Sequence, residues 1–476
     1  MKTQKVLFTG TILLSFILLA SCGEDTIKYS YSLDISKFAD YKENEYCRTN
    51  INSLNDNNYP YLAQVKNLFP YLKDENGQYY KADTSIYPFD TNQIYIRYAK
   101  EKLDSTSTIY SLENILGKYT YETHCLFDRH YYYLNQESSL INNLKVINDS
   151  YASGKELEID KRLYDILQEA KYLTKFSDGK FNLFVGELSD TWDYYISLNQ
   201  FNHSDKSDSE SYLLTDDPEK SLEGKEKISS LLSNTPQPSD IDNVLELKKS
   251  IDNEKEVYSV KFNKFKNAEK VSITLGGIGK GYLTEQLYSE YKKNNYTYGM
   301  LTAGTSSMVF FGNRVVNDNW YVGLSNPYGV YYDSLGTIKL DNTKYSASTS
   351  GSQVNYYYTK INDHIILRNH IIDPTTGYPN DYYNQIFLLS KSISSTKMDA
   401  LSTILSNCSF DEIQSYITKI RNDSNFGDLE FIFFKKQPLL SEAKVDVYLS
   451  KGLQDRGIIT KNNPSDCKIS FHNLNY

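Results

Sequence analysis

Helix-like and strand-like segments alternate irregularly between residues 112 and 434, and this order constrains the fold more than any other feature. Apolar residues recur at three- and four-residue steps in 157–173, which predicts a helix, and the alternating run 257–262 predicts a strand. Further helices are predicted at 112–133, 282–293 and 398–407, and further strands at 181–185, 271–275, 298–312, 320–324, 335–340 and 429–434. Because the regular beat of a Rossmann or barrel fold is missing, we expect an α+β architecture of mixed sheets with packed helices.

Composition excludes several classes of protein. The 476 residues carry a formal charge of −9, so a broad nucleic-acid footprint, which needs an excess of basic residues, is not expected. A hydrophobic fraction of 40% with 23% charged residues suits a globular chain rather than a membrane bundle or a disordered polymer. The 44 tyrosines can both pack and donate hydrogen bonds, which allows a core despite the modest apolar total.

The N-terminus has the pattern of a secretory signal. Lys2 and Lys5 precede the apolar stretch 6–20, which is shorter than the roughly 20 residues that span a bilayer. The stretch ends in Leu-Ala-Ser before Cys22 and resembles a bacterial lipobox, where cleavage precedes a cysteine that becomes a diacylglyceryl thioether. We therefore expect a lipoprotein signal peptide at 1–21 and a lipid anchor at Cys22 on the extracytoplasmic face of a bacterial cell membrane. The alternative is an ordinary signal peptide with an incidental cysteine.

The rest of the chain divides by composition. Residues 22–95 are polar and rich in Tyr and Asn, which predicts a tether and N-terminal extension before one domain at 96–476. Within that domain, 202–242 is polar and contains three prolines, and we expect an exposed insertion there. Widely spaced cysteines without a CxxC pair indicate neither a zinc site nor a redox dithiol, and their pairing stays open: Cys47, Cys125, Cys408 and Cys467.

The glycine-rich segment 274–281 joins a predicted strand to a predicted helix. Closely spaced glycines let backbone N–H groups approach a phosphate, a helix N-terminus favours anions, and Lys280 could add a positive charge. The pattern matches neither the dinucleotide fingerprint nor the Walker A loop, because Gly281 follows Lys280. By itself, a tight structural turn explains the segment equally well.

Two further segments contain chemically useful side chains. His370 precedes a Pro-Thr-Thr-Gly turn in 370–379 and could move a proton or bind phosphate near neutral pH, although a lone histidine is more often structural. Asp399 and Thr403 lie four residues apart, so a helix places both on one face, where their oxygens suit Mg²⁺. The alternative for this pair is a capping or surface role. The hydroxyl-rich segment 347–352 is expected to be a turn.

The order of these motifs is more specific than any one of them. The succession 177–186, 190–192, 274–281, 301–305, 320–327, 348–351, 370–379 and 399–403 resembles the FAD:protein FMN transferases of the ApbE family. The resemblance covers roughly residues 105–435. It implies an α+β fold of the ApbE type, related to the T-fold, and transfer of FMN from FAD to a Thr or Ser hydroxyl of an extracytoplasmic flavoprotein, with release of AMP.

The resemblance also implies roles for individual residues. Asp399, Thr403 and the backbone carbonyl of Gly277 would bind Mg²⁺. Contacts to FAD would come from Lys280, from the backbone around Ile372, and from the stretch Lys180, Phe181 and Asn182. Thr274 stands where the family usually has Asp, and its hydroxyl can still form a hydrogen bond near FAD or the metal. His370 would accept the proton of the acceptor hydroxyl, and Lys280 would stabilise negative charge on the phosphate.

Two other functions stay open at this point. A Mg²⁺-dependent FAD pyrophosphatase would use the same residues with water as the acceptor and would produce FMN and AMP. A catalytically inactive flavin-binding lipoprotein is the third reading, and Thr274 in place of the family Asp is its main support.

Overall fold

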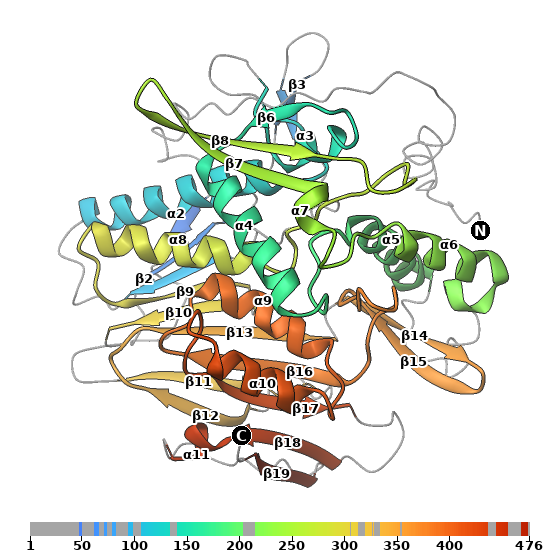
Figure 1. The fold of residues 1–476 in the computed structure, drawn as a ribbon. Coiled ribbons are helices and arrows are strands. Elements are labelled where there is room, and N and C mark those ends of the chain that lie inside the picture. The colour runs from blue at the N-terminus through green and yellow to red at the C-terminus, as the bar shows by residue number, and fades with distance from the viewer. Residues whose placement is uncertain are drawn as a thin grey trace, which may run out of the picture.

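The computed structural model describes most of the chain beyond residue 105, together with the backbone of five short strands before it (Figure 1). The described ranges are 47–49, 61–65, 71–73, 79–81, 94–98, 106–133, 140–202, 215–304, 306–312, 319–325, 327, 334–352, 355–436, 444–455 and 468–474. Cys22 and the signal segment 1–21 lie outside these residues, so the predicted lipid anchor stays a prediction. Among the described residues, no helix combines the length and the apolar character that a membrane span requires.

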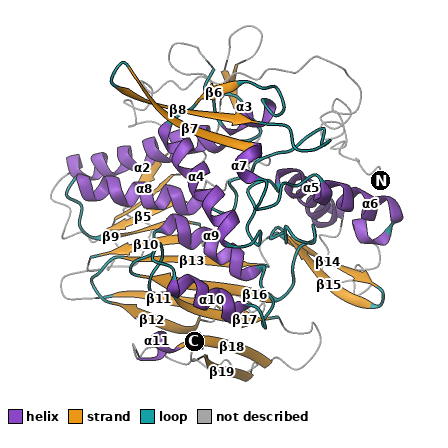
Figure 2. Cartoon of the chain, viewed as in Figure 1, coloured by secondary structure: helices purple, strands orange, loops and turns teal. Residues whose placement is uncertain are grey.

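A ten-stranded sheet runs through the described part of the chain (Figure 2). All neighbouring strands in it are antiparallel except the last pair, which is parallel. Its order in space is β1 (Cys47–Thr49), β2 (Tyr61–Val65), β5 (Ile94–Tyr98), β9 (Gly299–Ala303), β10 (Ser307–Phe311), β13 (Tyr345–Gly351), β16 (Tyr383–Ser390), β17 (Glu430–Lys435), β18 (Lys444–Ser450) and β19 (Lys468–Leu474). The expected domain boundary at residue 96 therefore falls inside β5, and part of the predicted tether belongs to the main sheet.

Alternate side chains of the central strands pack into two different clusters. In β16, Ile386 and Leu388 join the cluster formed by the helices, whereas Phe387 and Leu389 join the cluster beneath the hairpin of β11 (Trp320–Ser325) and β12 (Ser334–Leu340). This two-residue alternation is typical of a strand whose faces are both covered. The sheet is thus the middle layer of the molecule.

Helices cover one face of the sheet, as Figure 1 shows. They are α2 (Thr106–Phe127), α4 (Lys161–Phe176), α8 (Gly279–Lys293), α9 (Ser395–Ser406) and α10 (Ile413–Asn422). The serines of β13 lie directly under α9: Ser402 Oγ is 3.0 Å from Ser348 Oγ and 2.7 Å from Ser350 Oγ. Small side chains on both elements let this helix lie close to the sheet.

The remaining elements form smaller units around this core. The sheet of β6 (Glu156–Glu158), β7 (Leu245–Asp252) and β8 (Lys255–Phe262) lies near α3 (Leu144–Asp149). Figure 1 shows α5 (Gly186–Asn202) and α6 (Leu222–Ser233) beside the hairpin of β14 (Tyr356–Ile361) and β15 (His364–Asn369). The other short elements are β3 (Tyr71–Lys73), β4 (Tyr79–Lys81), η6 (Pro218–Lys220), α7 (Ile241–Val244) and α11 (Lys451–Asp455).

The expected α+β class is confirmed, but three local predictions are wrong. Residues 181–185 and 271–275 are loops joined by a single bridge between Val185 and Ser272, rather than strands. The Asn182 side chain accepts the Phe184 N–H at 2.9 Å, and this local bond folds the first of them into a turn. Residues 347–351 are part of β13 and not a turn, because their backbone pairs with β10 and β16, and the hydroxyls of Ser348 and Ser350 contact α9.

The described part of the expected insertion at 202–242 is folded, with many exposed residues and a few buried ones. Residues 215–242 contain η6, α6 and most of α7. The Asp217 side chain is buried in an ion pair, and Ile228 and Ile241 are buried in apolar clusters. A few apolar anchors among many polar residues are enough to hold this segment on the body of the protein.

Candidate functional site

The first helical turn of α8 lies directly against α9, and Gly281 makes this contact possible. A Cβ at Gly281 would stand 2.2 Å from the Ser395 carbonyl oxygen and 2.6 Å from Asp399 Cβ, so no larger residue fits without a shift. The Gly281 N–H donates to Asp399 Oδ2 at 2.9 Å. The N-terminal end of α8 therefore orients a carboxylate that is 3% exposed, an arrangement that the helix dipole favours.

The glycine turn before α8 approaches the same face of α9. The N–H groups of Ile278 and Gly279 both donate to the Leu275 carbonyl, at 3.1 and 2.8 Å, which closes a tight turn. A Cβ at Gly277 would stand 3.3 Å from Thr403 Oγ1 and 3.2 Å from the Phe181 ring. The structure thus brings together Gly277, Thr403 and Asp399, which the sequence predicts as metal ligands.

These three groups offer oxygen donors of the kind that Mg²⁺ prefers. They are one carboxylate, one hydroxyl and one backbone carbonyl, and Ser306 Oγ adds a contact of 3.5 Å to Asp399 Oδ1. Among the described residues no three or more His, Cys, Asp or Glu side chains cluster as a metal site. The donor set fits an ion that keeps several waters and shares the oxygens of a bound phosphate, which is typical of Mg²⁺.

Thr274 stabilises the glycine turn from inside. Its Oγ1 accepts the Gly276 N–H at 3.3 Å, and its backbone N–H donates to the Leu183 carbonyl at 2.9 Å. The hydroxyl is therefore hydrogen-bonded to the turn whether or not it also reaches a ligand. Its contacts place it in the glycine turn that leads into α8.

His370 lies just beyond the end of β15 and is exposed to solvent, although protein atoms closely surround its ring. These surroundings and the positive charge of Lys280 lower the pKa of His370 to about 4, while a hydrogen bond to the Asn355 backbone opposes the shift. The imidazole is therefore neutral at pH 7 and can accept a proton. The charge of Lys280 therefore lies close enough to His370 to influence its protonation.

The predicted FAD-contact stretch 180–182 has three differently placed side chains. Partial burial works against the charge of Lys180, but the carboxylates of Asp373 and Glu412 raise its pKa above the usual value. Phe181 is buried against Gly277. The Asn182 amide is buried and donates to the Pro236 carbonyl at 2.9 Å, so this side chain helps to hold the loop.

Ile372 is held by both its side chain and its backbone. The side chain packs in an apolar cluster with Trp192. Its backbone forms a bridge with Pro379, and its carbonyl accepts a hydrogen bond from the Asn407 amide at 2.9 Å. The Asn407 amide also donates to the Lys180 carbonyl, so the backbone of Ile372 lies next to the Lys180 loop.

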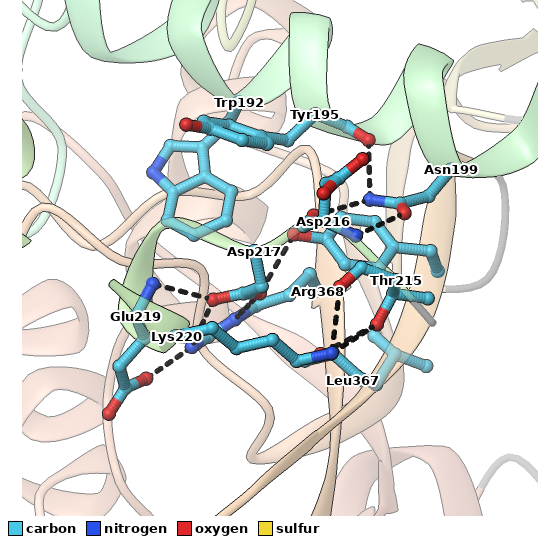
Figure 3. A network of polar contacts seen from close by, with 12 residues as sticks. Trp192, Tyr195, Asn199, Thr215, Asp216, Asp217, Glu219, Lys220, Leu367 and Arg368 are labelled. Carbon is cyan, nitrogen blue, oxygen red and sulfur yellow. Dashed lines mark hydrogen bonds and ion pairs between the residues drawn. The ribbon is translucent and has the colours of Figure 1, made fainter. Parts of the chain in front are cut away.

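An ion pair that the sequence analysis missed supports the strand before His370. Arg368 Nε donates to Asp217 Oδ2 at 2.9 Å, and the guanidinium also pairs with Glu219 (Figure 3). The Tyr357 hydroxyl donates to the same Asp217 oxygen at 2.8 Å. Both side chains of the main pair are almost completely buried. The segment around η6 therefore fixes β15, which leads directly into the candidate site.

Aromatic rings complete this support. The Arg368 guanidinium lies 5.3 Å from the centre of the Trp192 ring and 5.2 Å from that of Tyr378, within the range of cation–π attraction. Trp192 Nε1 donates to the Gly377 carbonyl at 2.8 Å, which ties α5 to the turn after His370. The only sequence signal for this cluster is a basic residue within an apolar strand, and its partners are far away in the chain.

Comparisons with known proteins place the chain among similar sequences and structures. A sequence model of the ApbE family matches residues 108–426. The protein named FAD:protein FMN transferase from Buchnera aphidicola subsp. Schizaphis graminum is 26% identical over 245 residues, which are 51% of this chain and 59% of that protein. The match thus spans less than two thirds of the length of this curated relative.

Two solved structures share the fold. The flavin transferase ApbE from Vibrio cholerae has a TM-score of 0.52 at 16% identity and covers 78% of this chain and 97% of that one. The apo form of the flavinyl transferase ApbE from Pseudomonas stutzeri has a TM-score of 0.51 at 16% identity, with 76% and 93% covered. At this level of identity the likeness shows the fold alone.

Proposed function

Because the chain belongs to the ApbE family, we propose that it is a Mg²⁺-dependent FAD:protein FMN transferase. It moves FMN from FAD to a Thr or Ser hydroxyl of a flavoprotein outside the cytoplasm and releases AMP. The observation that carries the proposal is the convergence of Gly277 and Thr403 beside Asp399 at the N-terminal end of α8. This arrangement offers oxygen ligands for a cation and backbone N–H groups for an anion in one place.

The chain's own residues account for binding of the diphosphate of FAD. The N-terminal end of α8 and its glycine turn favour an anion, and the nearby ammonium of Lys280 adds a positive charge. Among the described residues, no carboxylate is paired with that ammonium. When bound by Asp399, Thr403 and the Gly277 carbonyl, Mg²⁺ would neutralise charge on the phosphate oxygens.

His370 supplies the proton acceptor. The hydroxyl oxygen of the acceptor forms a bond to the phosphorus of the FMN half, and the bond from that phosphorus to the AMP oxygen breaks. The hydroxyl proton passes to the neutral imidazole of His370, whose low pKa keeps it unprotonated at neutral pH. Negative charge that gathers on the phosphate oxygens is stabilised by Lys280 and the N–H groups of the turn.

The test is covalent labelling of an acceptor. The mature chain is incubated with FAD, Mg²⁺ and a flavoprotein acceptor domain that a second flavin transferase labels in a parallel reaction. We expect flavin fluorescence on the acceptor band of a denaturing gel and release of AMP. If the parallel reaction labels the acceptor and this chain does not, the transferase proposal is wrong.

The same geometry also supports FAD pyrophosphatase activity, because His370 is exposed to solvent and could accept a proton from water. In that case FAD would give FMN and AMP with no acceptor present. Product analysis by chromatography, with and without the acceptor domain, separates the two activities.

We further propose that the mature chain is held at the outer face of a bacterial cell membrane by lipid on Cys22. The lipobox-like sequence before this cysteine supports the proposal. This location would place the enzyme beside extracytoplasmic acceptors.

A further inference from the structure

Asn407 lies at the C-terminal end of α9, the helix that carries Asp399 and Thr403. It caps the helix: its backbone N–H donates to the Thr403 and Ile404 carbonyls at 3.2 and 3.1 Å. The residue is completely buried. A buried amide in this position must find partners for two donors and one acceptor, or it destabilises the fold.

The three partners of the Asn407 side chain come from two distant segments, the Lys180 loop and residues 372–380. Its Nδ2 donates to the Lys180 carbonyl and to the Ile372 carbonyl, both at 2.9 Å. Its Oδ1 accepts from Asn380 Nδ2 at 3.1 Å. One amide therefore joins the two backbone segments predicted to contact FAD, and fixes both to the end of the metal-binding helix.

Asn380 extends this connection into the turn after His370. The same Nδ2 donates to Asp373 Oδ2 at 3.1 Å, and Asp373 Oδ1 accepts the Thr375 N–H at 2.8 Å. Asp373 is itself buried, so its carboxylate organises the turn from within. The network Asn407–Asn380–Asp373 thus sets the position of the whole 372–380 segment relative to α9.

We propose that Asn407 is a positioning residue for FAD: it sets the spacing between the Lys180 and Ile372 segments that hold the dinucleotide. The inference rests on the proposed function, but it concerns binding of FAD and not its transfer. Without the amide, the carbonyls of Lys180 and Ile372 lose a hydrogen-bond partner, and the two segments are no longer held together by it. Small displacements of binding groups cost affinity steeply, because the ligand no longer meets all of its contacts at once.

The metal ligands do not depend on this amide. Asp399 is oriented by the Gly281 N–H, and Thr403 lies against Gly277, so α8 and its turn hold both. Replacement of Asn407 should therefore weaken binding of FAD while, at saturating FAD, the Mg²⁺ concentration that gives half-maximal activity stays unchanged. A residue with a purely structural role would reduce stability without this selective effect.

The experiment measures the dissociation constant of FAD for the full chain by quenching of flavin fluorescence, in the presence of Mg²⁺. The main variant is Asn407→Leu. The milder Asn380→Ala removes one neighbour and leaves both bonds from Asn407 Nδ2 in place. The matched control is Asn143→Leu, because Asn143 is equally buried and its amide also bonds two carbonyls, those of Cys125 and Tyr131, and the Val146 N–H. Thermal unfolding is recorded for every variant.

We expect Asn407→Leu to raise the dissociation constant of FAD about tenfold or more, and Asn380→Ala to raise it about threefold. The control should lose thermal stability like Asn407→Leu but bind FAD as the wild-type chain does. Unchanged FAD binding by Asn407→Leu, or an equal loss in the control, would overturn the inference. If Asn407→Leu does not fold, the result for Asn380→Ala decides.

The outcomes also separate this inference from the proposed function. If the wild-type chain binds FAD but labels no acceptor, the transferase proposal fails and the positioning role can still be measured. If the wild-type chain does not bind FAD, both fail.

Discussion

At the scale of single residues, Asp399 is the strongest test of the metal site. We expect Asp399→Asn to lower the single-turnover rate by about 10²-fold, roughly 2.7 kcal/mol in the barrier, because a neutral amide neither balances nor holds Mg²⁺ as a carboxylate does. The amide oxygen can still accept the Gly281 N–H, so the variant should fold. Rapid quench with excess enzyme measures the rate. A rate close to that of the wild type would show that Asp399 is no metal ligand.

The interaction between His370 and Lys280 predicts how the activity depends on pH. The pKa of His370 is lowered to about 4, so kcat/KM should be constant near neutral pH and fall only as the pH drops toward that value and the imidazole becomes protonated. Lys280→Met removes a nearby positive charge that disfavours protonation. The pKa of His370 should then rise, and the acidic limb of the profile should move to higher pH.

The measurement is the pH profile of kcat/KM for both proteins. The position of the acidic limb is the quantity to compare, because Lys280→Met should also lower the rate at every pH if Lys280 contacts the phosphate as proposed. Lys293→Met is the control, since this lysine lies in the last turn of the same helix. If the limb stays in place in Lys280→Met, the histidine that is titrated is not His370, or the two side chains do not interact.

At the scale of elements, the contact between α8 and α9 requires a glycine at position 281, whereas Gly276 in the preceding turn leaves room for a larger side chain. Gly281→Ala should reduce the free energy of unfolding by about 1–3 kcal/mol, because its Cβ would overlap the Ser395 carbonyl oxygen at 2.2 Å. Gly276→Ala is the matched control in the same segment, since the nearest atom to its Cβ would be Thr274 Oγ1 at 3.5 Å. Urea denaturation measures both variants. Equal effects would mean that the helices do not lie as close as the structure shows.

Elements with a strong local pattern could be predicted from the sequence. The helix predicted at 282–293 is α8, which begins three residues earlier, and the strand predicted at 257–262 is most of β8. The secondary structure of the segments 271–275 and 347–351 could not be predicted, because it depends on partners that are distant in the sequence. One is held by a single bridge, and the other pairs its hydroxyls with α9.

The candidate site divides in the same way. Where a motif is confined to one short segment, its geometry can be predicted. The four-residue spacing of Asp399 and Thr403 is enough to place both on one face of a helix. The pair Asp217 and Arg368 is 151 residues apart, and the amide of Asn407 reaches back 227 residues to Lys180. Such contacts leave no periodic trace in the sequence, so only the fold reveals them.

At the scale of the whole molecule, the N-terminal region both joins the fold and carries the predicted anchor. The strands β1, β2 and β5 extend the main sheet beyond β9. Between Cys22 and β1 lie residues 23–46, which can reach at most about 90 Å when fully extended. A lipid on Cys22 would therefore keep the catalytic domain within that distance of the membrane, where it can meet only acceptors on the same face.

This arrangement predicts that Cys22→Ser releases the protein from the membrane. Each buried CH₂ of an acyl chain contributes about 0.8 kcal/mol to membrane binding, so a diacylated cysteine holds a protein firmly and a serine does not. The full chain is produced in a bacterium that processes lipoproteins, and membranes are separated by ultracentrifugation. We expect the wild type and the control Cys47→Ser in the membrane pellet, and Cys22→Ser in the supernatant. If Cys22→Ser stays in the pellet after a high-salt wash, another part of the chain binds the membrane and the anchor proposal is wrong.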